Sequence, residues 1–588
     1  MAAKCGKLAT LHEMFAGIDY ETYYDKNCSI TNGLGNYLNH DLFDAYMVSI
    51  YCSDNFAWVG HPKDAPWEKL DGVVALSHNR GFDQPVHEQL IKEGIIPQTN
   101  FSEWHCTADM AAYSGYPRSL KESLKHSLGV VMSKEIRDNM KGRQFSELGH
   151  DEKVDLAKYA LFDAKGCACL WEKESDAWPE WERELSQETT RMCWEGIPVD
   201  KETMEVAINT LSRVIFDAID ILPWTAEQAG ALSPKEWSAF CRSQGKEPPK
   251  SMAKDDPEVI EWIKANPKEG EVLQATHKLR GANSLLKKFS TMVQRVDNGR
   301  LAYGLKYFGA HTGRDSGDSG FNVQNMPRGG MYGADLRSCI RAGAGKTLLV
   351  SDLAQIEARC AAWLAGESDM LELARQGMDW YEAQARAFNM YTGTGALKTQ
   401  NPTLRHTMKQ MSLGCQFAMS GNKFASITGV EYDDAVSMVR TFRSKMPKLV
   451  RLWGNLERDM RKSAGGIYEI GLPSGRTMKY RNVELEKGLS AEIPRGGKMQ
   501  RLRFWKGTLI ENATQAFARD VFMDRVIALR KAGHKVVLRV HDEVVIEADK
   551  DNAKEAAEDI RRIMSEPPEW CASLPLGADV EQMERYTK

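Results

Sequence analysis

Two adjacent carboxylates, Asp542 and Glu543, stand inside the apolar stretch LRVHDEVVIEA of residues 538–548. The residues on either side predict two buried strands joined by a tight turn. Two like charges about 4 Å apart repel by roughly 4 kcal/mol at an effective dielectric near 20. An exposed polar turn would tolerate the two acids, and so would a bound cation that neutralises them. This stretch alone leaves both interpretations open.

Four more acids and a tyrosine occur early in the chain at informative spacings. In AGIDYETYY, a predicted strand, Asp19 and Glu21 share one face because residues two apart point the same way. Asp83 follows an apolar run, and Tyr159 and Asp163 lie four apart in a helical pattern. Each acid alone could be an ordinary solvated residue. Together they form the kind of oxygen-rich set that hard divalent cations prefer.

A third group follows in the C-terminal two thirds. Asp352 ends an apolar strand just before a predicted helix, where it could simply be the helix N-cap. In RHTMKQMSLGCQFAMSG the spacing of four predicts one helix face that carries Arg405, Lys409, Leu413 and Phe417. A plain amphipathic helix would not place two cations at one end of its stripe. Two cations on one face can form charge-assisted hydrogen bonds with an anion.

The elements that position these residues must belong to several domains, because 588 residues exceed one hydrophobic core. No apolar run could span a membrane and the start lacks a signal peptide's core, so a cytoplasmic location without a membrane partner is expected. Twelve cysteines without framework spacing indicate reduced thiols rather than zinc ligands.

The net charge of −4 excludes a uniformly basic nucleic-acid binder but not local basic patches. Residues 278–306 hold seven Lys and Arg against one acid, and residues 471–508 hold nine against three. The second segment contains RGGKMQRLRFWKG, where glycine, cations and aromatics interleave. Such stretches are either solvated surface or grooves that follow a phosphate backbone.

The N-terminal set carries a family resemblance. D-x-E, N-x-x-x-D and Y-x-x-x-D, in this order, resemble the three motifs of proofreading 3′–5′ exonucleases. The resemblance gives catalytic roles to Asp19, Glu21, Asp83, Tyr159 and Asp163. It implies that the four acids hold two Mg²⁺ ions and that the tyrosine orients the attacking water. It also implies that residues 1–185 form a ribonuclease-H-like α/β exonuclease domain.

The later motifs resemble those of family A DNA polymerases. SDLAQIEAR is similar to motif A, with Leu353 and Ala354 in place of Tyr and Ser, and VHDEVV is similar to motif C. The resemblance makes Asp352, Asp542 and Glu543 catalytic and makes the two aspartates ligands of two Mg²⁺ ions, which Mn²⁺ can replace. RHTMKQMSLGCQF is similar to motif B, although Leu413 and Phe417 depart from its usual aromatic residues. The implied dNTP-binding residues are Gln355, Glu357, Tyr381, Arg405, Lys409, Leu413 and Phe417.

Two further segments, HTGRDSGDSGFNVQNMP and ENATQAFARD, resemble the parts of that family that contact primer–template. With the motif C histidine, the implied DNA-binding residues are Thr312, Arg314, Asn322, Gln324, Asn325, Gln515, Arg519 and His541. The expected fold is therefore a multidomain α/β protein with a right-hand polymerase domain over residues 186–588. Its subdomains are a thumb at about 200–300, a palm at about 301–360 and 510–588, and fingers at about 361–509.

The resemblance implies a template-directed DNA polymerase with proofreading, acting as a monomer on primer–template DNA and dNTPs. The length leaves no room for a 5′-nuclease domain, which suits a phage-type member that replicates a phage genome. Candidate partners are a helicase, a primase or a single-strand-binding protein. Three alternatives stay open: an exonuclease whose polymerase half is a DNA-binding scaffold, a single-subunit RNA polymerase, and a non-enzymatic replication adaptor.

Overall fold

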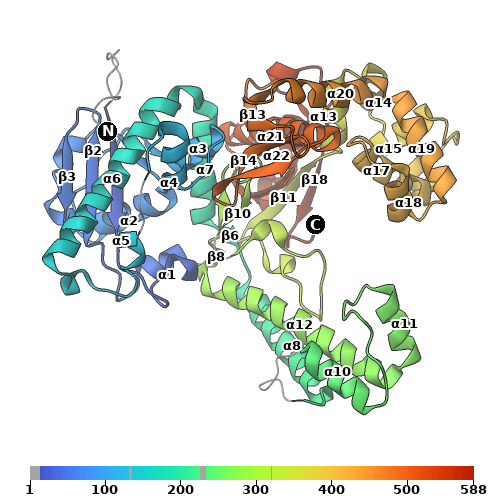
Figure 1. The fold of residues 1–588 in the computed structure, drawn as a ribbon, viewed down its shortest axis with the longest axis horizontal. Helices are drawn as coiled ribbons and strands as arrows, with labels where there is room; N and C mark the ends of the chain where they lie inside the picture. The colour runs from blue at the N-terminus through green and yellow to red at the C-terminus, as the bar shows by residue number, and fades with distance from the viewer. Residues whose placement is uncertain (1–13, 132–134, 225–232, 319–320) are drawn as a thin grey trace.

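The computed structural model describes residues 14–131, 135–224, 233–318 and 321–588. Figure 1 shows an N-terminal unit in blue, a helical arm in green and a C-terminal body in yellow to red. The expectation about a signal peptide falls on residues 1–13, outside the described residues. Within the described ranges, no helix is long and apolar enough to cross a membrane.

A five-stranded mixed sheet forms the centre of the N-terminal unit, in the order β3-β2-β1-β4-β5. β1, β4 and β5 run parallel, whereas β2 and β3 are antiparallel to their neighbours. The strands are β1 (Phe15–Glu21), β2 (Met47–Cys52), β3 (Ala57–Gly60), β4 (Val74–Ser77) and β5 (Trp104–Cys106). The helices around them are α1 (Leu34–Leu38), α2 (Arg80–Lys92), α3 (Thr107–Tyr113), α4 (Leu120–Ser123), α5 (Glu135–Asp138), α6 (His150–Glu174) and α7 (Glu180–Glu195).

One glycine sets the distance between α6 and the central strand. A Cβ atom on Gly17 of β1 would lie 2.0 Å from the backbone oxygen of Ala164 on α6. Since any side chain would clash there, the glycine allows α6 to lie directly on β1. This contact brings the acids of the helix close to those of the strand.

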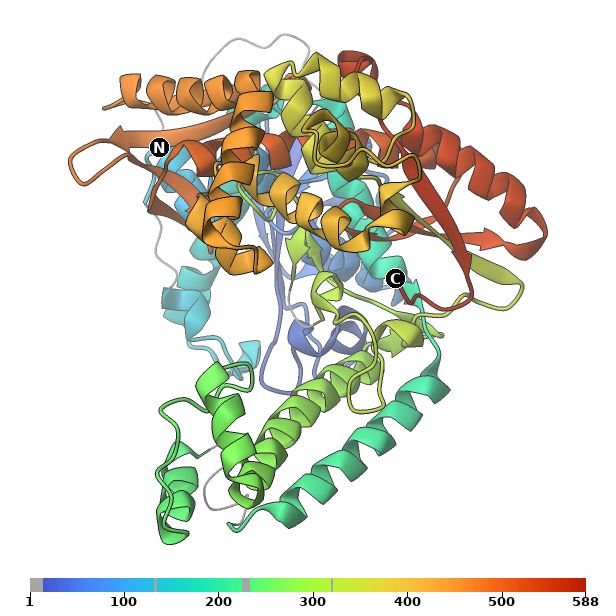
Figure 2. The same ribbon diagram turned by 90° about the vertical axis from the view of Figure 1, so that its right-hand side faces the viewer.

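The helical arm projects away from the rest of the molecule, as Figure 2 shows. Its helices are α8 (Lys201–Ile221), α10 (Pro234–Ser243), α11 (Pro257–Ala265) and α12 (Pro267–Gln294), and α8 packs along α12. Trp237 and Leu273 belong to a small core that is separate from the main one. Short strands lie at its base, one before the arm and four after it in the chain: β6 (Ile197–Pro198), then β7 (Val296–Asp297), β8 (Arg300–Leu301), β9 (Leu305–Lys306) and β10 (Ser316–Gly317).

The C-terminal body is built on a four-stranded antiparallel sheet in the order β16-β17-β11-β18. Its strands are β11 (Lys346–Leu353), β16 (Val536–Val540), β17 (Glu543–Asp549) and β18 (Ala578–Met583). The helices α21 (Lys506–Lys531) and α22 (Ala553–Ser565) pack in the same hydrophobic core. Because β11 is buried from Thr347 to Ser351, burial fixes its register and carries Asp352 to the end of the strand, next to its final residue Leu353.

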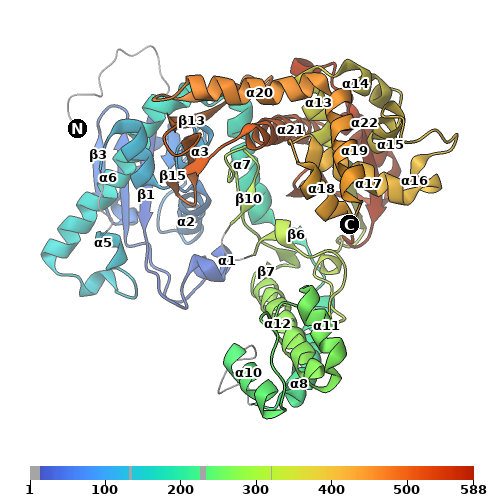
Figure 3. The ribbon, with the colours of Figure 1, turned by 45° about the vertical axis from the view of Figure 1, so that its right-hand side comes forward.

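A second helical group has its own core. It comprises α13 (Ile356–Ala365), α14 (Ser368–Arg375), α15 (Trp380–Ala387), α16 (Leu397–Gln400), α17 (Pro402–Cys415), α18 (Gly421–Thr428), α19 (Tyr432–Lys445) and α20 (Pro447–Lys462). The segment expected to form the fingers also contains an antiparallel sheet of β12 (Tyr468–Gly471), β13 (Thr477–Glu484), β14 (Ser490–Arg495) and β15 (Lys498–Arg503). Buried side chains of this sheet, such as Tyr480, join the main core. Figure 3 shows β13 and β15 beside α3 of the N-terminal unit.

Candidate active sites

The fold brings the C-terminal acids together at one edge of the β16-β17-β11-β18 sheet. Asp352 lies at the end of β11, opposite Glu543 in the β11–β17 register. The backbone N–H of Leu353 donates to the backbone oxygen of Asp542 at 3.2 Å. Asp352 and Asp542 come from distant parts of the chain, so only the sheet pairing makes them neighbours.

The turn between β16 and β17 gives the adjacent acids Asp542 and Glu543 different surroundings. Val540 pairs with Glu543, which leaves a two-residue turn, and His541 in it has a φ of 57°. Histidine adopts this left-handed region more readily than most residues other than glycine. Asp542 stays half-buried at the turn, whereas the buried Glu543 carboxylate accepts a hydrogen bond from the Tyr586 hydroxyl at 2.6 Å. Tyr586 has no motif around it, so sequence reasoning could not predict this contact.

The electrostatics of this edge favour a cation. Burial, followed by the charge of Asp542, raises the pKa of Asp352 from 3.8 to about 6. Burial also raises the pKa of Asp542 and that of Glu543. Lys588 and Arg328 lower the pKa of Asp352 and offset part of this effect. A positive ion between the aspartates would relieve the cost of ionising them.

The turn after Asp352 shows why this residue is not a helix cap. The N-cap of α13 is Gln355, with a φ of 48°, so the N-cap interpretation of Asp352 is wrong. The side-chain amide of Gln355 donates to Asp379 at 3.4 Å. Glu357, in the first turn of α13, forms an ion pair with Arg314 at 2.5 Å. Two residues expected to contact different ligands are therefore bound to each other.

The helix α17 presents three of the four residues predicted to share one face. The Arg405 guanidinium forms an ion pair with Asp379 at 2.8 Å and lies 5.2 Å from the centre of the Tyr381 ring. Lys409 and Leu413 are exposed on the same helix.

The prediction of one helix face is wrong for the fourth residue, Phe417. The helix ends at Cys415, and the chain then turns through Ala418, which has a φ of 65°. A residue in the left-handed region cannot continue an α-helix, so the aromatic ring lies in the turn beyond it.

The predicted DNA-contacting residues have varied surroundings. Asn322 accepts a hydrogen bond from the backbone N–H of Gln324 at 3.0 Å, and Gln515 donates to Glu511 at 3.3 Å. Thr312 is buried, whereas the side chains of Asn325 and His541 are exposed.

Arg519 contradicts the expectation of a DNA contact. Its side chain is buried and forms an ion pair with Glu182 of α7, where one of the N–O distances is 2.9 Å. Tyr307 donates a hydrogen bond to the same carboxylate at 2.6 Å. A buried, paired guanidinium cannot reach a groove, so this arginine instead links the N-terminal unit to the C-terminal body.

The N-terminal unit gathers all five predicted exonuclease residues. Asp19 and Glu21 come from β1, Asp83 from α2, and Tyr159 and Asp163 from α6. Burial, followed by the charge of Asp163, raises the pKa of Asp19 well above its ordinary value and that of Glu21 to about 8. Burial raises the pKa of Asp83 to about 7, although its carboxylate accepts from the backbone N–H of Tyr20 at 3.2 Å.

Arg137 of α5 is a neighbour of this cluster that sequence reasoning missed. Its charge lowers the pKa of Asp19, Glu21 and Asp83, against the larger effect of burial. Nothing in the sequence distinguishes this arginine from other basic residues around it. Its charge offsets only part of the rise that burial causes in the pKa values of these acids.

The acids lie close enough for their charges to interact, but they do not form a finished metal cage. Over the described ranges, no group of three or more His, Cys, Asp and Glu side chains is arranged to hold an ion. One oxygen of Asp19, Oδ2, is buried without a hydrogen-bond partner. An unsatisfied buried oxygen of this kind is suited to coordinating a cation.

Comparisons with known proteins identify the family of this chain. The sequence model of DNA polymerase family A matches residues 231–588. A DNA polymerase of Bacillus phage SP02 is 30% identical over 404 residues, which are 58% of this chain and 60% of the relative. DNA polymerase I of Aquifex aeolicus is 23% identical over 558 residues, 88% of each protein. The thermostable DNA polymerase I of Thermus thermophilus is 26% identical over 326 residues, 55% of this chain and 37% of the relative.

The match thus covers less than two thirds of two of these relatives, 60% of the phage protein and 37% of the Thermus protein. Among solved structures, it resembles the POL domain of Pol1 from M. smegmatis in complex with DNA primer-template and dNTP. The TM-score is 0.69, the identity is 18%, and the match covers 97% of this chain and 96% of the other. At this identity the likeness shows a common fold.

Proposed function

The chain belongs to DNA polymerase family A, and on this premise we propose that it adds deoxynucleotides to the 3′ end of a DNA primer as a template directs. The observation that carries the proposal is the meeting of Asp352 and Asp542 at one sheet edge, where burial makes both acids costly to ionise. The helix α17, in which Arg405 and Lys409 are four residues apart and so on one face, would bind the nucleotide.

The donor set fits a hard divalent cation. Asp352 and Asp542 offer carboxylate oxygens, which Mg²⁺ prefers, and since burial raises the pKa of both acids, a bound cation would favour their ionised forms. We assign these two residues to hold Mg²⁺ in the C-terminal body. When bound, the metal would supply Lewis-acid activation of the primer hydroxyl and charge neutralisation at the phosphates.

The other residues of the site bind and select the nucleotide. Arg405 would exchange its ion pair with Asp379 for the triphosphate, because a phosphate oxygen carries at least as much charge as the carboxylate. Lys409, one turn further along α17, adds a second cation. Glu357, held by Arg314, would exclude a ribose 2′-hydroxyl by occupying its space.

The N-terminal unit supports a second activity, removal of nucleotides from the primer 3′ end. Its sheet places Asp19 and Glu21 on the central strand, and the close contact at Gly17 brings α6 and Asp163 beside them. These three acids and Asp83 would hold divalent cations, while the Tyr159 hydroxyl, which burial keeps protonated, would orient a water molecule. Proofreading follows when a mispaired end frays and enters this site as a single strand.

Primer extension tests the first proposal. A labelled primer on its template is incubated with Mg²⁺ and dNTPs, using the parent protein, Asp542→Ala and Asp549→Ala. Asp549 lies at the far end of β17 in an exposed ion pair with Lys346, so its variant is the matched control. The parent and the control should extend the primer, whereas Asp542→Ala should be slower by about 10³-fold or more. Equal extension by all three proteins would overturn the assignment.

An exonuclease whose C-terminal body only holds DNA is the second candidate. Two observations favour it: Arg405 is tied to Asp379, and Phe417 lies off the helix that should present it. In the same assay this candidate predicts that the parent shortens primers but never extends them.

A further inference from the structure

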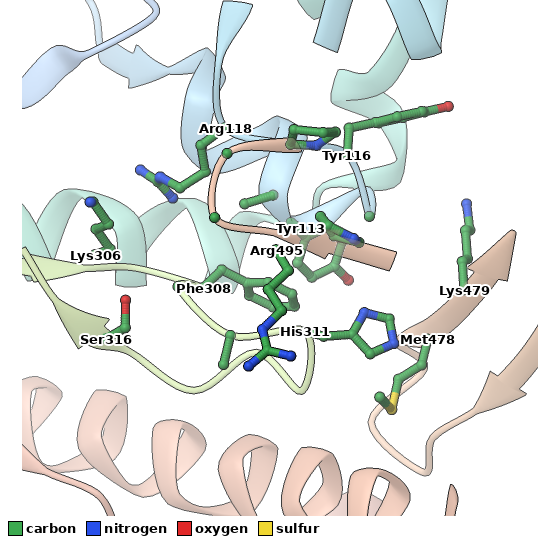
Figure 4. A pocket seen from close by; sticks show the side chains of 18 of the residues that line it. Tyr113, Tyr116, Arg118, Lys306, Phe308, His311, Ser316, Met478, Lys479 and Arg495 are labelled. Atoms are coloured by element: carbon green, nitrogen blue, oxygen red, sulfur yellow. The ribbon is translucent and has the colours of Figure 1, made fainter. Parts of the chain in front are cut away.

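A cavity lies where the N-terminal unit meets the C-terminal body, away from both acid clusters. It has a volume of about 350 Å³, which is within the range of about 300–1,000 Å³ for small-ligand sites. Three segments form its walls: residues 112–118 after α3, the loop 306–316, and the β12–β15 sheet. Figure 4 shows Arg118 and Lys306 at one end and Lys479 at the other. We call this cavity the junction pocket.

The ionised side chains that line the junction pocket are all positive. Five cations line the junction pocket and no carboxylate does; the cations are Arg118, Lys306, Arg476, Lys479 and Arg495. The first three are compensated from outside the pocket, because they pair with Asp109, Asp318 and Asp520. Within the part of the chain that the structure describes, Lys479 and Arg495 have no carboxylate partner. The pocket therefore keeps two uncompensated positive charges.

The uncompensated arginine is placed by the basic stretch noted in the sequence. Arg495 pairs with Lys498 across the turn of the β14–β15 hairpin, and the turn itself is Gly496-Gly497. Both glycines have positive φ, 57° and 79°, which a tight hairpin turn requires. In Figure 4 the Arg495 side chain points toward the loop that carries Phe308 and His311. The hairpin thus places the Arg495 side chain next to the loop that carries the Phe308 and His311 rings.

The rings give the pocket a second kind of surface. Tyr113, Tyr116, Phe308 and His311 line it, and the Tyr113 and Phe308 rings lie edge to face with their centres 5.5 Å apart. The His311 atom Nε2 is buried and has no hydrogen-bond partner among the described residues. Phe308 has a φ of 54°, a strained conformation for a bulky residue and one that is common at functional sites.

Cations beside aromatic rings match the two parts of a nucleotide, its phosphate and its base. We propose that the junction pocket binds an unpaired stretch of DNA strand, with phosphates on Lys479 and Arg495 and a base against the rings. A strand is favoured over a free nucleotide because the pocket is open and joins the two units. Arg118 and Lys306 also line a neighbouring cavity that reaches Asn79 and Phe82, beside Asp83. The inference rests on the proposed action on DNA.

The test uses the full chain and a single-stranded oligo(dT), with Ca²⁺ in place of Mg²⁺ to prevent excision. Lys479→Gln with Arg495→Gln removes the two free charges of the pocket. Lys487→Gln with Lys498→Gln is the matched control, because Lys487 in the β13–β14 turn and Lys498 on β15 are both exposed and do not line the pocket. The slope of log K against log salt should become shallower by about 1.4 in the pocket variant, at roughly 0.7 per phosphate. The control should keep the parent's slope.

Three results would overturn the proposal or part of it. If both double variants keep the parent's slope while the parent extends a paired primer, only the junction pocket inference fails. If the parent neither binds oligo(dT) nor extends a primer, the proposed function itself fails. Equilibrium dialysis with dTMP and dTTP is the second arm. If the pocket variant loses affinity for these nucleotides and not for oligo(dT), the pocket binds free nucleotides and the strand assignment is wrong.

Discussion

The two acid clusters differ in how strongly the protein resists their ionisation. At the C-terminal sheet edge, the pKa of Asp352 rises to about 6 and two cations, Lys588 and Arg328, lower it in part. In the N-terminal unit, the pKa values of Asp83 and Glu21 rise to about 7 and 8, with Arg137 as the compensating cation. The N-terminal cluster therefore depends more on an added cation. The comparison predicts that divalent cations affect the N-terminal cluster more strongly than the C-terminal one.

The largest predicted effect comes from a steric change that should impair the N-terminal cluster and leave the C-terminal one unaffected. Gly17→Ala places a Cβ atom where Ala164 stands, so α6 must move by more than 1 Å from β1. Misplacement of this size should reduce excision by about 10²-fold and leave extension unaffected. Gly35→Ala is the control, because its Cβ would meet nothing within 4 Å. Equal excision rates for the two variants, measured without dNTPs, would contradict the role of this contact.

The next largest predicted effect is on the selection of deoxyribose over ribose in the incoming nucleotide. Glu357→Ala should lower the preference for dNTPs over rNTPs by about 10- to 200-fold, the range for one steric contact in a pocket. Single-nucleotide incorporation kinetics with dTTP and rUTP measure it. Glu372→Ala removes an exposed glutamate from α14 and should leave the preference as it is. If Glu357→Ala keeps the parent's selectivity, Glu357 serves only as the partner of Arg314.

A smaller effect is expected at the departure from motif B. Leu413 offers no hydroxyl to a nucleotide that lacks its own 3′ group, so the parent should discriminate against dideoxynucleotides. Leu413→Tyr should relax this by roughly 3- to 10-fold, the value of one hydrogen bond. Leu413→Phe supplies the ring without the hydroxyl and should behave like the parent. Chain-termination ratios that are the same for all three proteins would refute the idea.

The smallest effect is a dependence of stability on pH. A carboxyl with a raised native pKa binds more protons when folded than when unfolded, so stability falls as pH rises between its two pKa values. For Glu21 and Asp83 this window runs from about 4 to about 8. In EDTA the melting temperature should fall by several degrees across it, and Mg²⁺ should restore most of the loss.

Asp83→Asn sharpens this measurement, since the variant should lose part of the pH dependence. Asp41→Asn, an exposed site, is its control. A melting temperature that rises with pH in EDTA would show that the acids are compensated within the protein.

The motifs predicted the candidate site better than they predicted its connections. Local patterns identified Asp352, Asp542 and the N-terminal acids, because each sits at a strand end or on a helix face. The family resemblance, rather than local patterns, implied the multidomain α/β fold. Local patterns could not show that Glu543 accepts a hydrogen bond from Tyr586 or that Arg519 is buried in an ion pair with Glu182. Such pairs depend on which surfaces meet in the fold, and a buried arginine looks like a surface arginine in the sequence.

The most direct test of the central claim, two separate sites in one chain, is a crosswise assay. Asp19→Ala, Asp542→Ala and the parent act on matched and mispaired labelled primers with Mg²⁺ and dNTPs in one gel. The account predicts that Asp542→Ala only shortens primers, that Asp19→Ala only extends matched ones, and that the parent corrects and then extends mispaired ones. Loss of both activities in either variant would contradict it, because the two acid clusters would then serve a single site.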